Sequence, residues 1–271
     1  MLSQRSHDRA HVISLFDDQA FEKITDLEWP TFIDEGLDNK EEFPRGVNIL
    51  GPVNGIYCIF NRLIERWLGS LVLWNPTTRE YKHILPRASL PFPSQLIAGF
   101  WNPNDDYDMK RPVSIDLGFG FDDNTNDFKV VVISHWGVDD GLDDFRWHVR
   151  IYSLFNDSWR TIYYLDAFNN ALLPFQGLNP PFPRIDSFPQ YTHCHLNGVF
   201  HWSCITNSIL AQSCYDILAF DMRSESFQLI KGPLITQDFY DFRSVWEVRG
   251  TLSMTGSSFD GQGSFSGIVD L

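Results

Sequence analysis

The chain has 271 residues, of which 43% are hydrophobic and 21% are charged, and its formal net charge is −14. This composition is typical of a folded chain rather than a disordered one, and the length allows one all-β domain. The negative charge argues against a nucleic-acid partner, because binding to a phosphate backbone needs clustered lysine and arginine. A basic protein partner is electrostatically compatible with it.

The N-terminal residues MLSQRSHDRAHVISLFDD lack the apolar core of a secretory signal peptide, and no apolar run approaches the length of about 20 residues that spans a bilayer. We therefore expect no membrane partner and place the chain in the cytoplasm, with the nucleus as a second compartment. HVISLF (11–16) predicts a strand. We take residues 1–44 as this strand and an acidic linker, which leads into one domain over residues 45–271.

GPVNGIYCIF (51–60) predicts a strand entered through an Asn-Gly turn, and the apolar spacing of NRLIERWL (61–68) predicts a short helix. DLGFGFDDNTNDFKVVVISHW (116–136) predicts a hairpin around an Asp/Asn-rich turn. HCHLNGVFHWSC (193–204) predicts another around Asn197-Gly198, which is a strong two-residue turn signal. SVWEVRGTLSM (244–254) repeats the glycine-turn pattern.

One hairpin pattern occurs three times without a gap, as VLWNPTTREYKHI, RIYSLFNDSWRTI and LAFDMRSESFQLI. Each copy has an aromatic residue, turn-forming residues, and a second aromatic seven positions after the first. We expect the first aromatic of each copy to be buried between neighbouring sheets. The six repeat aromatics are Trp74, Tyr81, Tyr152, Trp159, Phe220 and Phe227.

The copies begin at residues 72, 150 and 218. These spacings exceed one propeller blade of about 40 to 50 residues, so we expect two blades per interval. Many short strands with regular turn signals predict an all-β, kelch-like β-propeller, an array of antiparallel hairpins or blades that is incomplete or not fully closed. An immunoglobulin-like sandwich is the alternative, although it would not require the repeated aromatic hairpin.

The predicted elements also resemble a known family. GPVNGIYCIF, LVLWNPTTREYKHILP, DLGFGFDDNTNDFKVVVISHW, VRIYSLFNDSWRTI, LNGVFHWSC and ILAFDMRSESFQLI follow one another in the order found in the F-box-associated domain of plant F-box proteins. HDRAHVISLFDD (7–18) additionally resembles the segment that precedes this domain in S-locus F-box proteins of pollen self-incompatibility.

This resemblance implies a substrate receptor of an SCF-type (Skp1–cullin–F-box) ubiquitin ligase. In such proteins the F-box docks on Skp1, and the propeller-like domain binds the protein to be ubiquitinated. No leucine- and proline-rich F-box precedes HVISLF, and the chain ends soon after the third copy. We therefore expect Skp1 and the cullin as partners only if an F-box is supplied upstream, and a domain truncated at its C-terminus.

Two acidic loops are the candidate partner-binding sites. They would steer a basic substrate by their charge, and an aromatic residue in the first would serve as an anchor. Solvated surface is the other interpretation of these charges. The candidate residues are Asp105, Asp106, Tyr107 and Asp108 in the first loop and Asp139, Asp140, Asp143 and Asp144 in the second.

No motif supports a metal, a cofactor or catalysis. A histidine and cysteine cluster lies in one predicted hairpin, where Asn197-Gly198 could bring His201 across from His193 and His195, but a structural hairpin explains these residues as well. Asp122, Asn124 and Asn126 begin like a calcium loop but lack its glycine and glutamate, which favours a polar turn. Gly118 and Gly120 lack the third glycine of a nucleotide-binding loop. The remaining members of the cluster are Cys194 and Cys204.

The function predicted from the sequence is therefore recognition of a protein substrate for a ubiquitin ligase, with a basic pistil ribonuclease as a candidate substrate. Two alternatives remain at this point. One is an inert truncated product that does not bind Skp1, and the other is a propeller enzyme that uses the histidine and cysteine cluster.

Overall fold

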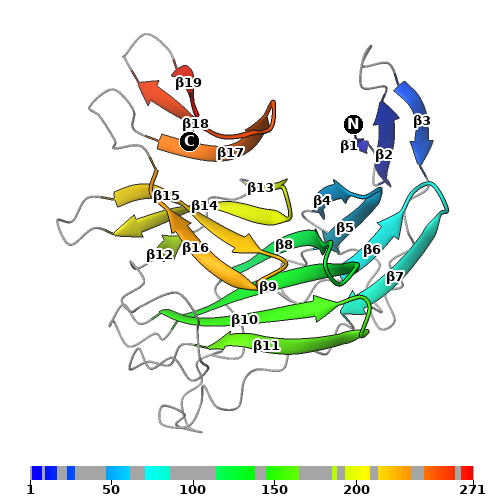
Figure 1. The fold of residues 1–271 in the computed structure, drawn as a ribbon. Coiled ribbons are helices and arrows are strands. Elements are labelled where there is room, and N and C mark those ends of the chain that lie inside the picture. The colour runs from blue at the N-terminus through cyan, green and yellow to red at the C-terminus, as the bar shows by residue number, and fades with distance from the viewer. Residues whose placement is uncertain are drawn as a thin grey trace, which may run out of the picture. The chain divides into compact units, whose positions relative to one another are not determined.

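The computed structural model describes residues 2–7, 10–16, 23–27, 47–61, 71–85, 114–137, 145–164, 185–187, 193–207, 213–232, 241–259 and 264–270. Every regular element among them is a β-strand, and every strand pair is antiparallel (Figure 1). No helix in this part of the chain could cross a membrane. The chain divides into two compact units, Met1–Pro91 and Phe92–Leu271.

Unit 1 contains a three-stranded and a four-stranded sheet. The strands of the first are β1 (Leu2–His7), β2 (Ala10–Phe16) and β3 (Lys23–Leu27), and β2 confirms the strand predicted from HVISLF. The second has the order β4-β5-β6-β7. Its strands are β4 (Val47–Val53), β5 (Ile56–Asn61), β6 (Leu71–Asn75) and β7 (Glu80–Leu85). Asn61 ends β5, and the rest of the predicted helix at 61–68 lies outside the described residues.

Unit 2 contains three sheets. The first has the order β11-β10-β9-β8, with β8 (Ser114–Asp122), β9 (Asp127–Gly137), β10 (Phe145–Ser153) and β11 (Ser158–Tyr164). The second contains β12 (Ile185–Ser187), β13 (His193–Leu196), β14 (Val199–Asn207), β15 (Ser213–Asp221) and β16 (Ser226–Ile230). The third contains β17 (Asp241–Val248), β18 (Thr251–Phe259) and β19 (Ser264–Asp270).

Three hairpins turn through two residues that both have positive φ. The turns are Asn54-Gly55, Asn197-Gly198 and Arg249-Gly250, with φ of 47° to 52° at the first residue and 79° at the glycine. Positive φ at both positions is the type I′ geometry, whose twist matches the flanking strands. The three predicted glycine turns are therefore confirmed, as are the hairpins β8–β9 and β13–β14.

Each repeat copy forms the last hairpin of one sheet. The copies are β6–β7, β10–β11 and β15–β16, and successive copies lie in successive sheets. The expectation of two blades per interval is therefore wrong for the described strands, because the spacing includes long segments, 86–113 and 165–184, outside them. The broader prediction of an all-β array of antiparallel hairpins is confirmed.

The two aromatics of each copy face each other across the hairpin. A spacing of seven residues around a four-residue turn makes them direct partners: Trp74 with Tyr81, Tyr152 with Trp159, and Phe220 with Phe227. The first aromatic of each pair is buried, with at most 4% of its surface exposed. The exposure of the second aromatic varies between the copies: Phe227 is buried, Trp159 is partly buried and Tyr81 is 42% exposed. Tyr152–Trp159 and Phe220–Phe227 also form ring contacts, with centroids 5.3 and 4.7 Å apart.

Both faces of the sheet β12–β16 are covered within unit 2. On one face, Trp202 lies against β8 and donates its indole N–H to the Leu117 carbonyl at 3.0 Å. A Cβ added at Gly118 would lie 2.5 Å from Trp202 Cζ2, so glycine is needed for this close approach. On the other face, Ile217 packs with Val245, Leu252 and Met254 of β17 and β18. Burial on both faces explains why apolar residues do not alternate strictly with polar ones along β15.

We predict that Phe220→Ala lowers the free energy of unfolding by about 3 to 5 kcal/mol, because a large buried ring is removed from a packed core. Phe155→Ala is the control, since this ring is exposed, and it should change the value by no more than about 0.5 kcal/mol. Chemical denaturation followed by tryptophan fluorescence measures both. Equal effects of the two substitutions would show that the repeat aromatics do not form the core.

Candidate functional site

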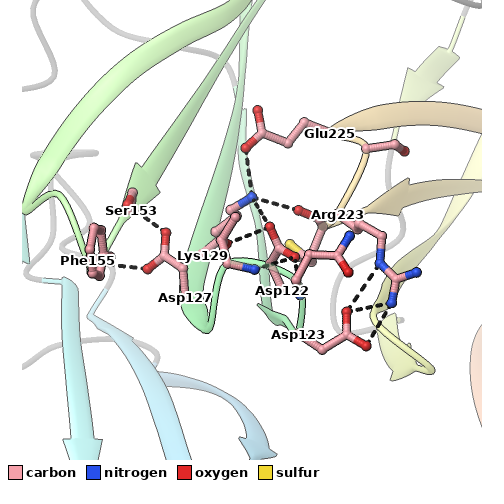
Figure 2. Close-up of polar contacts among 12 residues, drawn as sticks. Asp122, Asp123, Asp127, Lys129, Ser153, Phe155, Arg223 and Glu225 are labelled. Atoms are coloured by element: carbon pink, nitrogen blue, oxygen red, sulfur yellow. Dashed lines mark hydrogen bonds and ion pairs between the residues drawn. The ribbon is translucent and has the colours of Figure 1, made fainter.

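Three four-residue turns of unit 2 are joined by side-chain contacts. We refer to these turns, each with one flanking residue on either side, as the turn cluster (Figure 2). It comprises residues 122–127, 153–158 and 221–226. They connect β8 to β9, β10 to β11, and β15 to β16. The two-residue turn at 197–198 lies beside them, because the Gly198 carbonyl accepts the Met222 N–H at 3.0 Å. One end of two neighbouring sheets therefore presents four turns together.

The four-residue turns share one local geometry. In the turn after Asp122, the Oδ1 atom accepts the N–H groups of Asn124 and Thr125 at 3.0 and 3.4 Å. Asp221 Oδ1 likewise accepts the N–H groups of the residues two and three positions later. Asn75 Oδ1 makes the same two hydrogen bonds in the equivalent turn of unit 1. Each turn ends with a residue of positive φ, namely Arg79, Asn126, Asp157 or Glu225. The polar turn predicted at Asp122 is confirmed.

The turn after Ser153 departs from this pattern, because serine is too short to accept both N–H groups. Its Oγ accepts the Asn156 N–H at 3.1 Å. The Phe155 N–H instead donates to Oδ1 of Asp127, at 2.8 Å, and Ser153 Oγ donates to Oδ2 of the same carboxylate at 2.6 Å. Asp127 belongs to the neighbouring hairpin and is buried. A carboxylate from one turn thus completes the hydrogen bonding of the next.

Lys129 connects the two sheets. Its ammonium group donates to Asp122 Oδ2 at 2.7 Å, to the Met222 carbonyl at 2.8 Å and to Glu225 Oε1 at 2.8 Å. An ammonium group has three protons, so all its donors are used. Lys129 is 6% exposed and Asp122 is 2% exposed, which makes this a buried ionic contact between β8–β9 and the β15–β16 turn.

The pKa values of the two buried partners favour their charged forms. Burial alone would raise the pKa of Asp122, but hydrogen bonds from Lys129, Thr125 and the Asn124 N–H, together with the lysine charge, lower it to about 2. Burial likewise opposes the lysine charge, but the hydrogen bonds to Asp122 and Glu225 raise the pKa of Lys129 above its ordinary value. The pair therefore stays ionised at neutral pH.

Two further ion pairs, both at the surface, join the same sheets. Arg160 of β11 binds the second oxygen of Glu225, and Arg223 makes a forked contact with Asp123, with N–O distances of 2.6 and 2.7 Å. Arg223 and Asp123 are both more than half exposed, so water and salt screen this pair strongly. Phe155 stands at the tip of its turn with 79% of its side chain and backbone surface exposed.

The acidic loops predicted as binding sites lie outside the described residues. They comprise Asp105, Asp106, Tyr107 and Asp108 and, in the second loop, Asp139, Asp140, Asp143 and Asp144. Their binding role stays a prediction. The turn cluster was not predicted as a site, although its turn residues and Lys129 are visible in the sequence.

The histidine and cysteine cluster is divided between two faces of its hairpin. His193 and His195 lie opposite Trp202 and Phe200, whereas His201 lies opposite Cys194. His201 therefore does not lie across from His193 and His195, as a metal site would require, because partners in an antiparallel pair project to the same face. His193 stacks on Phe200 with the ring centroids 5.4 Å apart. Cys204 is two residues from Trp202 on one strand, which gives it the same face as that tryptophan.

Burial also favours the neutral forms of these side chains. It lowers the pKa of His193 and of His201 to about 4, so both imidazoles are neutral at pH 7. It raises the pKa of Cys194 to about 11, with a further contribution from the Glu247 charge. Cys58, Cys194 and Cys204 are free thiols, and within the described ranges no group of three or more His, Cys, Asp or Glu residues could hold a metal ion.

Comparison with known proteins gives a family match over nearly the whole chain. The family model described as the F-box associated beta propeller domain matches residues 1–264. Together with the antiparallel sheets, this match confirms the predicted propeller-type fold and the resemblance to the F-box-associated domain. The resemblance to S-locus F-box proteins stays a prediction.

Curated relatives from Arabidopsis thaliana agree with this match. An F-box/kelch-repeat protein is 22% identical over 208 residues, which cover 76% of this chain and 44% of the relative. A second protein, named as an F-box protein, is 24% identical over 265 residues, which cover 92% of this chain and 61% of the relative. The chain thus spans about half the length of these relatives.

Solved structures show only distant similarity. The endo-arabinase from Bacteroides thetaiotaomicron aligns over 99% of this chain and 88% of its own, with 9% identity and a TM-score of 0.45. The α-L-arabinofuranosidase from Lactobacillus brevis aligns over 83% of this chain and 66% of its own, with 10% identity and a TM-score of 0.41. Similarity at this level supports no inference.

We predict that Lys129→Met lowers the free energy of unfolding by about 3 to 5 kcal/mol, because it leaves the buried Asp122 carboxylate without its cation. Arg223→Ala, which removes the exposed pair with Asp123, should have a much smaller effect. Denaturation at low and high salt measures both variants. A loss below about 1 kcal/mol for Lys129→Met would contradict a structural role for the buried contact.

A second prediction concerns Asp127 and Ser153. Asp127→Ala should destabilise the chain by about 1 to 3 kcal/mol, because the Phe155 N–H loses its acceptor. Ser153→Asp should destabilise the parent chain, since it places a second carboxylate beside Asp127. In the Asp127→Ala background, the same substitution should stabilise the chain, since the new carboxylate can accept both N–H groups as Asp221 does.

The sign of the Ser153→Asp effect is therefore expected to reverse between the two backgrounds. Denaturation of the parent, the two single variants and the double variant provides the measurement. An effect of Ser153→Asp with the same sign in both backgrounds would contradict the conclusion that Asp127 supplies the acceptor that Ser153 lacks.

Proposed function

The chain belongs to the F-box associated β-propeller domain family, and on this premise we propose that it recognises a protein substrate for a ubiquitin ligase of the SCF (Skp1–cullin–F-box) type. The family match over residues 1–264 is the observation that carries the proposal. The role is binding, and the chemistry of ubiquitin transfer belongs to other subunits. Skp1 and the cullin would join the chain only through an F-box supplied upstream of it.

The described geometry supports a binding role. The Lys129 contact and the Asp127 contacts fix the turns of two sheets in one arrangement. Turns held by buried polar contacts lose little further freedom when a partner binds, which favours affinity. Loops and turns on a rigid β scaffold are also where binding surfaces of such proteins commonly lie.

The proposed substrate is a basic protein, and a secreted pistil ribonuclease is the specific candidate. The support is the net charge of −14, which would attract a cationic partner and accelerate association at low salt. The acidic residues of the two predicted loops would contribute to the same attraction.

An F-box fused upstream of the full chain tests the proposal in Arabidopsis protoplasts. We expect the fusion to deplete a defined set of proteins, and a proteasome inhibitor should restore their abundance. The F-box alone and the chain alone are the controls and should deplete none of them. Co-expressed pistil ribonuclease and the isoelectric points of the depleted proteins test the substrate class.

Depletion of acidic and basic proteins alike would overturn the basic-substrate part of the proposal. If the fusion depletes nothing beyond the F-box control, the receptor function itself is wrong. That second outcome would favour an inert chain.

A further inference from the structure

Phe155 is the most exposed large hydrophobic residue in the part of the chain whose burial is described, with 79% of its surface accessible. Its equivalents in the other four-residue turns are Thr77, Asn124 and Arg223, which are all polar. The turn geometry therefore does not require an aromatic residue at this position. A single exposed apolar residue is ordinary on a protein surface, so its significance depends on how it is held.

The backbone around Phe155 is held by contacts on both sides. Its N–H donates to the buried Asp127, and the Asn156 N–H donates to Ser153 Oγ. The Leu154 N–H donates to the Phe128 carbonyl at 3.0 Å, and the Tyr152 hydroxyl donates to Asp157 Oδ1 at 2.6 Å. Figure 2 shows Phe155 beside Ser153 and Asp127. An exposed ring on a fixed backbone can enter a pocket of a partner with little further ordering.

The charges of the turn cluster indicate which partner this surface fits. The turn cluster contains six carboxylates and one cation, and the adjoining Lys129 and Arg160 add two more cations. The carboxylates belong to Asp122, Asp123, Asp127, Asp157, Asp221 and Glu225. A turn surface that carries both an exposed apolar ring and an excess of negative charge is complementary to an apolar pocket with basic side chains at its rim.

We propose that Phe155 is the apolar anchor by which the turn cluster binds its protein substrate, and that the substrate offers an apolar pocket rimmed by lysine or arginine. This inference rests on the proposed function, because it assigns the contact surface of the same receptor. Aromatic anchors in pockets commonly supply most of the affinity of an interface. A second copy of this chain fits less well, since it would bring a turn cluster of the same sign against the first.

The experiment uses the full chain with a photo-crosslinking p-benzoylphenylalanine placed at position 155 and, in a matched control, at position 77. Thr77 occupies the equivalent place in the four-residue turn of unit 1, is exposed, and lies outside the turn cluster. We expect a crosslink at position 155 to one basic protein, which mass spectrometry identifies and which is then purified. Its affinity is measured for the parent chain and for Phe155→Ala, Phe155→Leu and Thr77→Ala.

We expect Phe155→Ala to weaken binding at least tenfold, Phe155→Leu to retain part of the affinity, and Thr77→Ala to stay near the parent. All three variants should keep the melting temperature of the parent. If the parent binds the purified protein and Phe155→Ala binds equally well, the anchor is wrong while the proposed function stands. If the parent binds no protein in this assay and the F-box fusion depletes none, the proposed function fails.

Two further outcomes would also overturn the inference. A crosslink from position 155 only to a second copy of the chain would identify a self-association contact. A fall in the melting temperature of Phe155→Ala would show that the ring packs within the chain instead of binding a partner.

Discussion

The buried ammonium group of Lys129 is the contact on which the arrangement of unit 2 depends. Removing an ammonium group from water is unfavourable by several kcal/mol, so it is stable there only if its protons have acceptors and its charge has a partner. Asp122, Glu225 and the Met222 carbonyl meet these requirements from two different sheets. The relative position of the β8–β9 and β15–β16 turns is therefore fixed by this ionic contact as well as by the hydrogen bond from the Trp202 indole N–H to the Leu117 carbonyl of β8.

The carboxylates of the turn cluster act in a similar way at shorter range. Asp122 and Asp221 hold their own turns, whereas Asp127 holds the turn of the neighbouring hairpin because Ser153 is too short to do so. Side chains of different lengths thus produce the same backbone geometry, because the acceptor comes either from the turn itself or from the neighbouring hairpin. The result is a set of turns whose backbones are constrained while their outward side chains differ, which is the arrangement a recognition surface needs.

The local part of this structure could be predicted from the sequence. Aromatics seven residues apart around turn-forming residues predict a hairpin, and the Asn-Gly pairs predict two-residue turns, because these signals act between near neighbours in the chain. The position of His201 opposite Cys194 also follows from the turn at Asn197-Gly198, since a two-residue turn fixes the register of the strands it joins. This register places His201 on the face of Cys194, away from His193 and His195.

The long-range part could not be predicted in the same way. Lys129 and its acceptors Met222 and Glu225 are separated by 93 and 96 residues, and nothing local to either segment indicates the contact. The expected two blades per repeat interval also differ from the single sheet per copy among the described strands, because the length of a connecting segment does not show whether it contains a further blade. Tyr81 and Phe227 occupy equivalent repeat positions but differ in exposure, since burial depends on neighbours that the repeat does not specify.

The most direct test of this account is the coupling free energy between Lys129 and Glu225. Denaturation of the parent, Lys129→Met, Glu225→Gln and the double variant gives this coupling as the departure of the double variant from the sum of the single ones. The account predicts a favourable coupling of at least about 1 kcal/mol, because the contact is largely shielded from water and joins two sheets. A coupling of zero within error would show that the two sheets are positioned without this contact and would contradict the account.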